Sequence, residues 1–510
     1  MPSNTVIKRM LSLALAAGLA LGALVLLAAS ASAAGRAAVA SAPAGVSFTV
    51  GTTDDLPDNH LGDGLCQDTA GDHKCSLRAA IQEVNALTST NNTIFVPAAT
   101  YTLTDDIDGD LQITNDVTIN GVLVITPGGT LATIIAGGPG WAHRILRVQK
   151  GAHVTLNELL ITHGNVPGLN GGGLDIVSGT VNLNTVYVIS NTAAHGGGIY
   201  NAGTLNMTAV NIASNKAFTD GAGIYNASAP TSDPNLTLTR STVNDNLVPG
   251  SGTGGALYNL GNALVLSSTL SYNLAGVGGA VANIEPGNMH IEGSLLYSNT
   301  AANGAGGGID TSGAAAVVGL VNSTVGANRA SSVGGGIANV SGEVDLFNAT
   351  VAENTSSTGL VILPGRGGGG LYTDALTFYM QNTLVANNHD AHNGPPDCDG
   401  TFYSNGYNLV RSLTGCTLTV TTTGDVTGVD PQLLPLGYRG GFTDLYPLGL
   451  HSPAVDAGNP GGCTFGLGQL PFDQRGQPRS VDGNGDGLAR CDIGAFELQL
   501  SRLFLPLTAR

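Results

Sequence analysis

This chain of 510 residues has little charge and few aromatic rings. Charged residues make up 11% of it and aromatic residues 5%, with a single Trp, while 42% of the residues are hydrophobic. There are 19 Lys and Arg against 36 Asp and Glu, a formal net charge of −17. Nucleic acids and anionic membranes attract basic proteins, so the acidic balance argues against both as partners. The hydrophobic content is ample for a core and argues against a disordered chain.

Long apolar runs are also rare, and the only one lies at the N-terminus. Two basic residues precede the apolar stretch Met10–Ala29, and small residues suited to cleavage follow it. This pattern predicts a secretory signal over Met1–Ala33 and a linker over 34–46. Because the run is long for a signal, an uncleaved N-terminal anchor is the competing interpretation. No transmembrane span remains after signal removal, and we expect a secreted or cell-surface protein.

Cysteine is scarce too, with six residues and no Cys-x-x-Cys pair. The missing pair argues against a zinc site. An exported chain forms disulfides, and pairing between sequence neighbours is the simplest of the possible connectivities. We therefore predict three disulfides, Cys66–Cys75, Cys398–Cys416 and Cys463–Cys491.

Glycine, in contrast, is abundant at 75 residues, and much of it belongs to a repeat between Gly171 and Asn387. One repeated phrase is Gly-Gly followed by an apolar residue, as in Gly197–Ile199. The other is an apolar residue, two variable residues and Asn, and successive asparagines are 24 to 33 residues apart. These eight asparagines are Asn191, Asn215, Asn246, Asn273, Asn299, Asn328, Asn354 and Asn387.

This period is typical of a solenoid, in which each repeat buries its core only against its neighbours. The segments between the phrases are short and β-rich, without a helix-length apolar pattern. We predict an all-β fold, a right-handed single-stranded parallel β-helix of the pectate lyase type. Stacking at about 4.8 Å would turn a recurring Asn into a ladder whose amides donate to one coil and accept from the next. A second, shorter column is expected at the asparagines that follow the Gly phrase, Asn201, Asn226, Asn259, Asn283 and Asn339.

The two phrases resemble the GGA[ILV] and FxxN repeats of the polymorphic outer-membrane protein family, which are surface β-helices. Val, Ile or Leu stands at the family's Phe position throughout. That family usually ends in a membrane β-barrel, a domain that we do not expect in this chain. The resemblance implies a surface scaffold and names no reaction.

An acidic segment followed by Cys75–Asn85 precedes the repeats. Ser76 can cap a helix in which Leu77, Ile81 and Val84 share one face, and such a helix would cover the open end of a solenoid. The segment resembles the CSLREA domain of exported β-helix proteins, with Ala79 in place of the family's Glu. We assign 47–92 to this N-terminal cap and 93–430 to the β-helix.

The last section contains Ser452–Gly458, Asp473–Gly476 and Asp492–Glu497 in that order. These three motifs resemble the choice-of-anchor Q domain at the C-terminus of secreted β-helix proteins. The resemblance implies a C-terminal cap over 431–497 and a tail over 498–510.

The same section holds the best candidate for a metal site. Asp482, Asn484 and Asp486 are spaced like the first ligands of a calcium loop, with Asp492 near its end. Ile493 stands where the loop needs Glu, so a hydrated Gly-rich turn is the alternative. No cofactor other than this candidate structural Ca²⁺ is indicated.

Catalytic residues are not evident. Carboxylates in the coils are scattered, and Trp141, beside His143 and Arg144, favours packing over sugar stacking because it stands alone. His163, His195 and His389 fall near coil corners, where packing or exposure is expected. We therefore predict a structural or adhesive scaffold that binds a surface polysaccharide or another surface protein. An extracellular polysaccharide lyase or glycoside hydrolase is the alternative.

Overall fold

The computed structural model describes residues 45–71, 73–104, 109–126, 129–228, 235–357, 366–375, 377–420, 424–465 and 468–499. The predicted signal, Met1–Ala33, most of the linker and nearly all of the tail lie outside these residues. Within the described part, no helix is long and apolar enough to cross a membrane.

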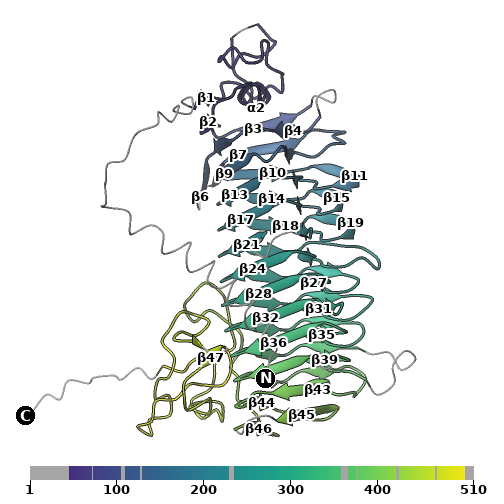
Figure 1. Cartoon of the computed structure of the whole chain (residues 1–510), viewed down its shortest axis with the longest axis vertical. Coiled ribbons are helices and arrows are strands. Elements are labelled where there is room, and N and C mark those ends of the chain that lie inside the picture. Colours follow the sequence, from purple (N-terminus) through teal and green to yellow (C-terminus); the bar gives the residue numbers. More distant parts are fainter. Residues whose placement is uncertain are drawn as a thin grey trace, which may run out of the picture.

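The chain winds into a right-handed parallel β-helix, as predicted (Figure 1). The first coils pass from sheet 1 through sheet 2 to sheet 4, and from β11 (Asn165–Asn170) onward a short sheet 3 lies between sheets 2 and 4. Neighbouring coils pair in parallel and in register, as Thr180–Asn184 pairs with Thr204–Thr208 in sheet 1. Apolar side chains of successive coils point inward and form one continuous core.

Sheet 1 consists of β1 (Ser47–Thr49), β2 (Asn92–Phe95), β5 (Val117–Asn120), β9 (His153–Asn157), β13 (Thr180–Asn184), β17 (Thr204–Thr208), β21 (Leu236–Thr239), β24 (Asn262–Leu266), β28 (Asn288–Glu292), β32 (Val317–Val321), β36 (Glu343–Phe347), β40 (Phe378–Gln381), the end of β43 (Cys398–Ser404) and β45 (Cys416–Val420). Because β1 pairs with β2, the first strand of the β-helix comes from the segment that we had assigned to the N-terminal cap.

Sheet 2 consists of β3 (Thr100–Leu103), β7 (Gly129–Gly137), β10 (Leu159–Thr162), β14 (Tyr187–Ile189), β18 (Asn211–Ala213), β22 (Thr242–Asn244), β25 (Thr269–Ser271), β29 (Leu295–Tyr297), β33 (Thr324–Gly326), β37 (Thr350–Ala352), β41 (Leu384–Ala386), β44 (Leu409–Val410) and β46 (Val426–Thr427). The antiparallel strand β6 (Leu123–Thr126) forms a hairpin with β7.

Sheet 3 is shorter and consists of β11 (Asn165–Asn170), β15 (Thr192–His195), β19 (Lys216–Asp220), β26 (Leu274–Ala275), β30 (Thr300–Ala301), β34 (Arg329–Ala330), β38 (Thr355–Ser356) and β42 (His389–Asp390). Sheet 4 consists of β4 (Leu111–Ile113), β8 (Leu146–Val148), β12 (Leu174–Ile176), β16 (Ile199–Asn201), β20 (Ile224–Asn226), β23 (Leu257–Asn259), β27 (Val281–Ile284), β31 (Ile309–Ser312), β35 (Ile337–Asn339), β39 (Leu371–Thr373) and the start of β43.

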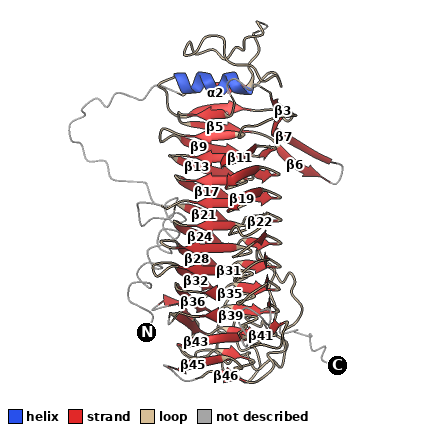
Figure 2. Cartoon of the chain, turned by 90° about the vertical axis from the view of Figure 1, so that its right-hand side faces the viewer, coloured by secondary structure: helices blue, strands red, loops and turns tan. Residues whose placement is uncertain are grey.

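The helix α2 (Leu77–Ala86) covers the N-terminal end of the solenoid (Figure 2). Ser76 is its N-cap, and its Oγ accepts a 3.0 Å hydrogen bond from the Ala79 backbone N–H. The buried face of α2 belongs to the same apolar cluster as the first coils. Both features confirm the predicted capping helix.

The C-terminal section, 431–499, does not lie over the end of the solenoid as expected. Its described residues fold back along the flank of the lower coils, where its only strands, β47 (Thr464–Phe465) and β48 (Gly468–Gln469), form a short hairpin (Figure 1). The physical reason is an apolar flank on sheet 2, where Leu384 and Leu409 pack against Leu445, Ile493 and Phe496.

Candidate functional site

The repeated asparagines form a continuous buried ladder at the corner between sheets 2 and 3. In a typical rung, Asn273 donates from its backbone N–H and its side-chain amide to Oδ1 of Asn299, at 3.0 and 2.9 Å. The same amide donates to the Val243 carbonyl of the preceding coil at 2.9 Å. Every polar group of the rung is thus engaged inside the protein, which gives this ladder a structural role.

The last rung corrects the prediction, because it is Asn388 and not Asn387. Asn354 donates to Oδ1 of Asn388 at 2.9 Å. Asn387 has a φ of 60° and occupies the left-handed turn position that Glu353 occupies one coil earlier. The strand register pairs Val351 with Val385, so the repeat must be counted from Val385 and not from Leu384.

The candidate calcium ligands Asp482, Asn484 and Asp486 accept hydrogen bonds from backbone N–H groups of their own loop. In the loop, Asp482 accepts from the backbone N–H groups of Gly485 and Gly487 at 2.6 and 3.0 Å, and Asn484 and Asp486 accept from N–H groups of the same loop. Asp492 is buried, and its oxygens accept from the N–H groups of Asp456 and Leu498. Among the described residues, no group of three or more His, Cys, Asp and Glu is placed to hold a metal ion.

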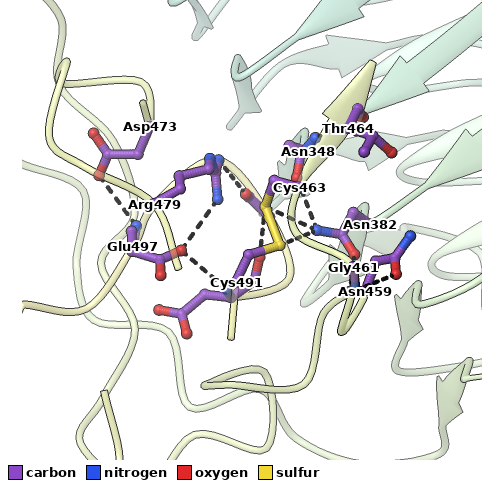
Figure 3. The surroundings of a disulfide bond; sticks show 12 residues. Asn348, Asn382, Asn459, Gly461, Cys463, Thr464, Asp473, Arg479, Cys491 and Glu497 are labelled. Carbon is purple, nitrogen blue, oxygen red and sulfur yellow. Dashed lines mark hydrogen bonds and ion pairs between the residues drawn. A yellow bond between two sulfur atoms is a disulfide. The ribbon is translucent and has the colours of Figure 1, made fainter. Parts of the chain in front are cut away.

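All six cysteines form the predicted disulfides, Cys66–Cys75, Cys398–Cys416 and Cys463–Cys491. The third one lies where the C-terminal section meets the coils (Figure 3). The side-chain amide of Asn382 contacts both sulfurs, at 3.2 and 2.8 Å, and its Oδ1 accepts from the Asn459 backbone. This disulfide therefore belongs to the seam that holds the section against the flank.

The most distinctive outward side chains lie on sheet 4 in the upper coils. Arg147, Asp175, Tyr200, Tyr225 and Tyr258 occupy one register position on the consecutive strands β8, β12, β16, β20 and β23. We call these five residues the tyrosine row. The neighbouring rings are stacked, with centroids 5.0 and 4.9 Å apart and interplanar angles of 15° and 20°.

The stacking decides what the row presents to a ligand. The faces of neighbouring rings are turned toward one another, so each half-buried tyrosine offers mainly its edge and its hydroxyl group. Burial, together with the negative charges of Asp175 and Asp220, raises the pKa of these phenols above 10.0. The hydroxyls therefore stay protonated and can both donate and accept hydrogen bonds.

A network of ion pairs closes one end of the row. Asp175 Oδ2 lies 3.2 Å from Nε of both Arg144 and Arg147, and Arg144 also pairs with Asp110 at 3.4 Å. Burial raises the pKa of the Asp175 carboxyl, and the two guanidinium groups oppose that rise. Two arginines and two carboxylates leave this end without a net formal charge.

The tip of sheet 3 lines the other side of the row. His195 ends β15 and packs edge-on against the Tyr225 ring at 5.1 Å. Asp220 ends β19, lies 3.4 Å from His195 and accepts a 2.7 Å hydrogen bond from the Thr253 hydroxyl. Of the three corner histidines, His195 alone joins the row, while His163 and His389 are exposed.

Farther down the β-helix the same register position is buried. It continues through Ala282, Asp310, Ala338, Tyr372 and Asp399. Ala338 and Tyr372 pack against Val333 in a small apolar cluster. Below Tyr258 this column is therefore inaccessible, whereas above Arg147 it continues to the exposed Gln112 on β4.

The sequence pattern predicted the inward asparagines of this face but not the outward tyrosines next to them. Tyr200, Tyr225 and Tyr258 each follow the Gly phrase and precede a column Asn. The asparagines do form the expected second column, since Asn201, Asn226 and Asn259 hydrogen-bond in succession at 2.8 and 2.7 Å. Because Asn201 points inward, the adjacent tyrosine had to point outward.

Comparison with solved structures finds chains of similar fold. The sequence matches no protein-family model and no curated protein. The fold is similar to that of the crystal structure of pectate lyase Pel9A, with a TM-score of 0.43 and 13% identity over 90% of this chain and 98% of that one.

Proposed function

We propose that this chain is a secreted or cell-surface scaffold that binds an extended, hydroxyl-rich polymer, such as a surface polysaccharide, along the tyrosine row. The observation that carries the proposal is the register. In three successive coils one tyrosine presents a protonated hydroxyl at a regular interval, next to the donors and acceptors of Arg147, His195 and Asp220. A polymer of repeating hydroxyl groups is the ligand that suits such a periodic surface.

The balance of charge favours a neutral polymer over an acidic one. Arg144 and Arg147 are already paired with Asp175, so neither guanidinium is free to neutralise a uronate. Export is supported by the three disulfides, which persist in oxidising surroundings.

The direct test is affinity electrophoresis of the folded chain in gels that contain neutral or acidic polysaccharides. Tyr225→Phe keeps the stacked ring and removes the hydroxyl, so it should weaken binding about 5-fold to 10-fold without unfolding the protein. Tyr187→Phe is the matched control, because Tyr187 is a half-buried tyrosine on sheet 2, away from the row. If both variants and the unmodified chain are retarded equally, the tyrosine row is not part of the binding site.

A lyase or glycoside hydrolase remains the second candidate, and one observation favours it. Asp175 is a buried carboxyl with a raised pKa that lies beside two arginines at the end of the row. Perturbed carboxyls of this kind occur at catalytic sites as well as in structural ion pairs. The same polysaccharides should be assayed for unsaturated and reducing ends. A product formed by the unmodified chain and lost in Asp175→Asn would assign catalysis to this end of the row.

A further inference from the structure

A cavity of about 550 Å³ opens at the corner between sheets 2 and 3 in the upper coils. The loop Gly137–Trp141 forms one side of it. His163 to Asn165, together with Ser190 and Thr192, line it from the next two coils. Its volume falls in the range of about 300–1,000 Å³ that is usual for small-molecule sites.

Packing keeps the wall of this cavity free of side chains. A Cβ atom on Gly137 would lie 2.4 Å from Cδ1 of Trp141 and 2.5 Å from the His163 carbonyl. A Cβ atom on Gly138 would lie 2.9 Å from the Leu103 carbonyl. Glycine is therefore required at both positions, and backbone lines this side.

Trp141 gives the cavity its one large apolar group. Its ring is only 4% exposed, and Nε1 donates a 3.0 Å hydrogen bond to the Arg144 carbonyl. Because Trp141 is almost fully buried and its polar atom is already engaged, a ligand can reach only a small apolar part of the indole.

The remaining lining is polar and carries no Lys, Arg, Asp or Glu. His163, Asn165 and Ser190 are exposed, and Thr192 is half-exposed. Asn165 is held in place by its amide, which donates to the Trp141 carbonyl at 3.4 Å. Hydroxyl, amide and imidazole groups thus come together from two successive coils around an apolar surface.

We propose that this cavity binds a single neutral sugar residue, such as the terminal unit of a glycan. Sugar hydroxyls both donate and accept hydrogen bonds, as do the side chains of Asn165, Ser190 and Thr192. The C–H groups of a sugar ring are apolar and can contact the small exposed part of the indole. A carboxylate or phosphate ligand would find no Lys or Arg in the lining. The inference shares its ligand class with the proposed function but uses a different surface. Strand β15 begins at Thr192 in the cavity and ends at His195 beside the tyrosine row.

The test uses the fact that Trp141 is the only Trp in the chain. Its fluorescence is recorded while the full chain is titrated with neutral monosaccharides, with short oligosaccharides that end in them, and with the corresponding uronic acids. We expect a saturable change with at least one neutral sugar and at least 10-fold weaker binding of its uronic acid. No saturable change with any neutral sugar, or equal binding of the uronic acid, would overturn the proposal.

Two variants connect the signal to the cavity. Ser190→Ala should weaken binding about 5-fold to 10-fold by removing one hydrogen bond. Its control is Ser214→Ala at the equivalent position of the next coil, which does not line the cavity. His163→Asn removes the imidazole and retains a residue that tolerates the left-handed φ of 61°. Equal effects of the two Ser→Ala variants would contradict the assignment.

The tyrosine row is tested separately. Tyr225→Phe should impair polysaccharide binding and leave the Trp141 titration unchanged. If the chain does not bind polysaccharide but gives a normal Trp141 titration, the proposal for the tyrosine row is wrong and the proposal for the cavity stands. The reverse result would support the tyrosine row alone.

Discussion

The side-chain amide of Asn354 donates to Oδ1 of Asn388 at 2.9 Å, and Asn388 donates in turn to Oδ1 of Asp397 at 3.0 Å. The ladder therefore ends on a carboxylate, whose other oxygen accepts from the Ser412 backbone at 2.9 Å. Burial raises the pKa of Asp397, and the hydrogen bonds from Asn388 oppose that rise. Asp397 thereby engages the amide and the backbone N–H of Asn388 at the end of the ladder.

Exchange of the last ladder residue should be costly, whereas exchange of its neighbour should not. Asn388→Ala removes the acceptor for two donors of Asn354 and leaves them buried, which should reduce the free energy of unfolding by about 3 kcal/mol. Asn387→Gly keeps a residue that adopts a φ of 60° and should change it by less than about 1 kcal/mol. Chemical denaturation, with hydrogen exchange of the lower coils, measures both. A larger loss for Asn387→Gly would contradict the corrected register.

The β-helix was predictable because its repeat depends on Asn and Gly, two residue types with strict physical requirements. An inward Asn is stable only when the next coil supplies its partner, and a Gly such as Gly197 is needed where a Cβ would lie 2.3 Å from the Lys216 carbonyl. The error at Asn387 arose because Asn387 and Asn388 are adjacent. The repeat motif fits Asn387 when it is counted from Leu384 and fits Asn388 when it is counted from Val385. Only the strand register distinguishes them.

Docking of the C-terminal section was harder to predict from the sequence, because it depends on which outward residues of the coils are covered. A signal does exist, since the outward position of sheet 2 that is Asn244 in an upper coil becomes Gly326, Ala352 and Ala386 in the lower ones. Small residues on three successive coils leave room for another segment, whereas the small Ala213 at the same position is followed by Asn244 and stays uncovered. What packs there follows only from the three-dimensional structure.

Gly326 provides the test of that docking. A Cβ at this position would lie 2.7 Å from the Tyr446 ring, whose hydroxyl donates to Glu353 at 2.9 Å. Gly326→Val should therefore displace the C-terminal section and make it sensitive to limited proteolysis, while the coils keep their circular dichroism. Ala213→Val, at the equivalent uncovered position, is the control. Unchanged proteolysis of Gly326→Val would show that this contact does not hold the section.

The loop 482–487 should be insensitive to calcium. Its carboxylates are used in turns of their own loop, and Asp456 Oδ2 accepts from the backbone of Gly483 and Asn484 at 3.0 and 2.8 Å. EDTA or added Ca²⁺ should leave the melting temperature unchanged, whereas Asp456→Ala should lower it. Calorimetry with both additions checks this, and a fall in melting temperature with EDTA that Ca²⁺ reverses would restore the calcium site.

Asp310 should make stability depend on pH. The side chain is 4% exposed, its Oδ1 has no hydrogen-bond partner, and burial raises its pKa to about 7. In the unfolded chain the carboxyl ionises near its ordinary value of about 3.9. Between these two values the unfolded state releases a proton that the folded state keeps, so rising pH favours unfolding, and above the folded pKa the cost is constant.

Asp310→Asn removes this titration while keeping a similar shape. The variant should match the original chain near pH 4 and become more stable as pH rises to 8. A difference of about 3 pKa units corresponds to about 4 kcal/mol as an upper limit. Because other groups titrate in both proteins, the quantity to plot is the difference in unfolding free energy between them. A difference that stays flat from pH 4 to pH 8 would mean that the Asp310 carboxyl is not held protonated by burial.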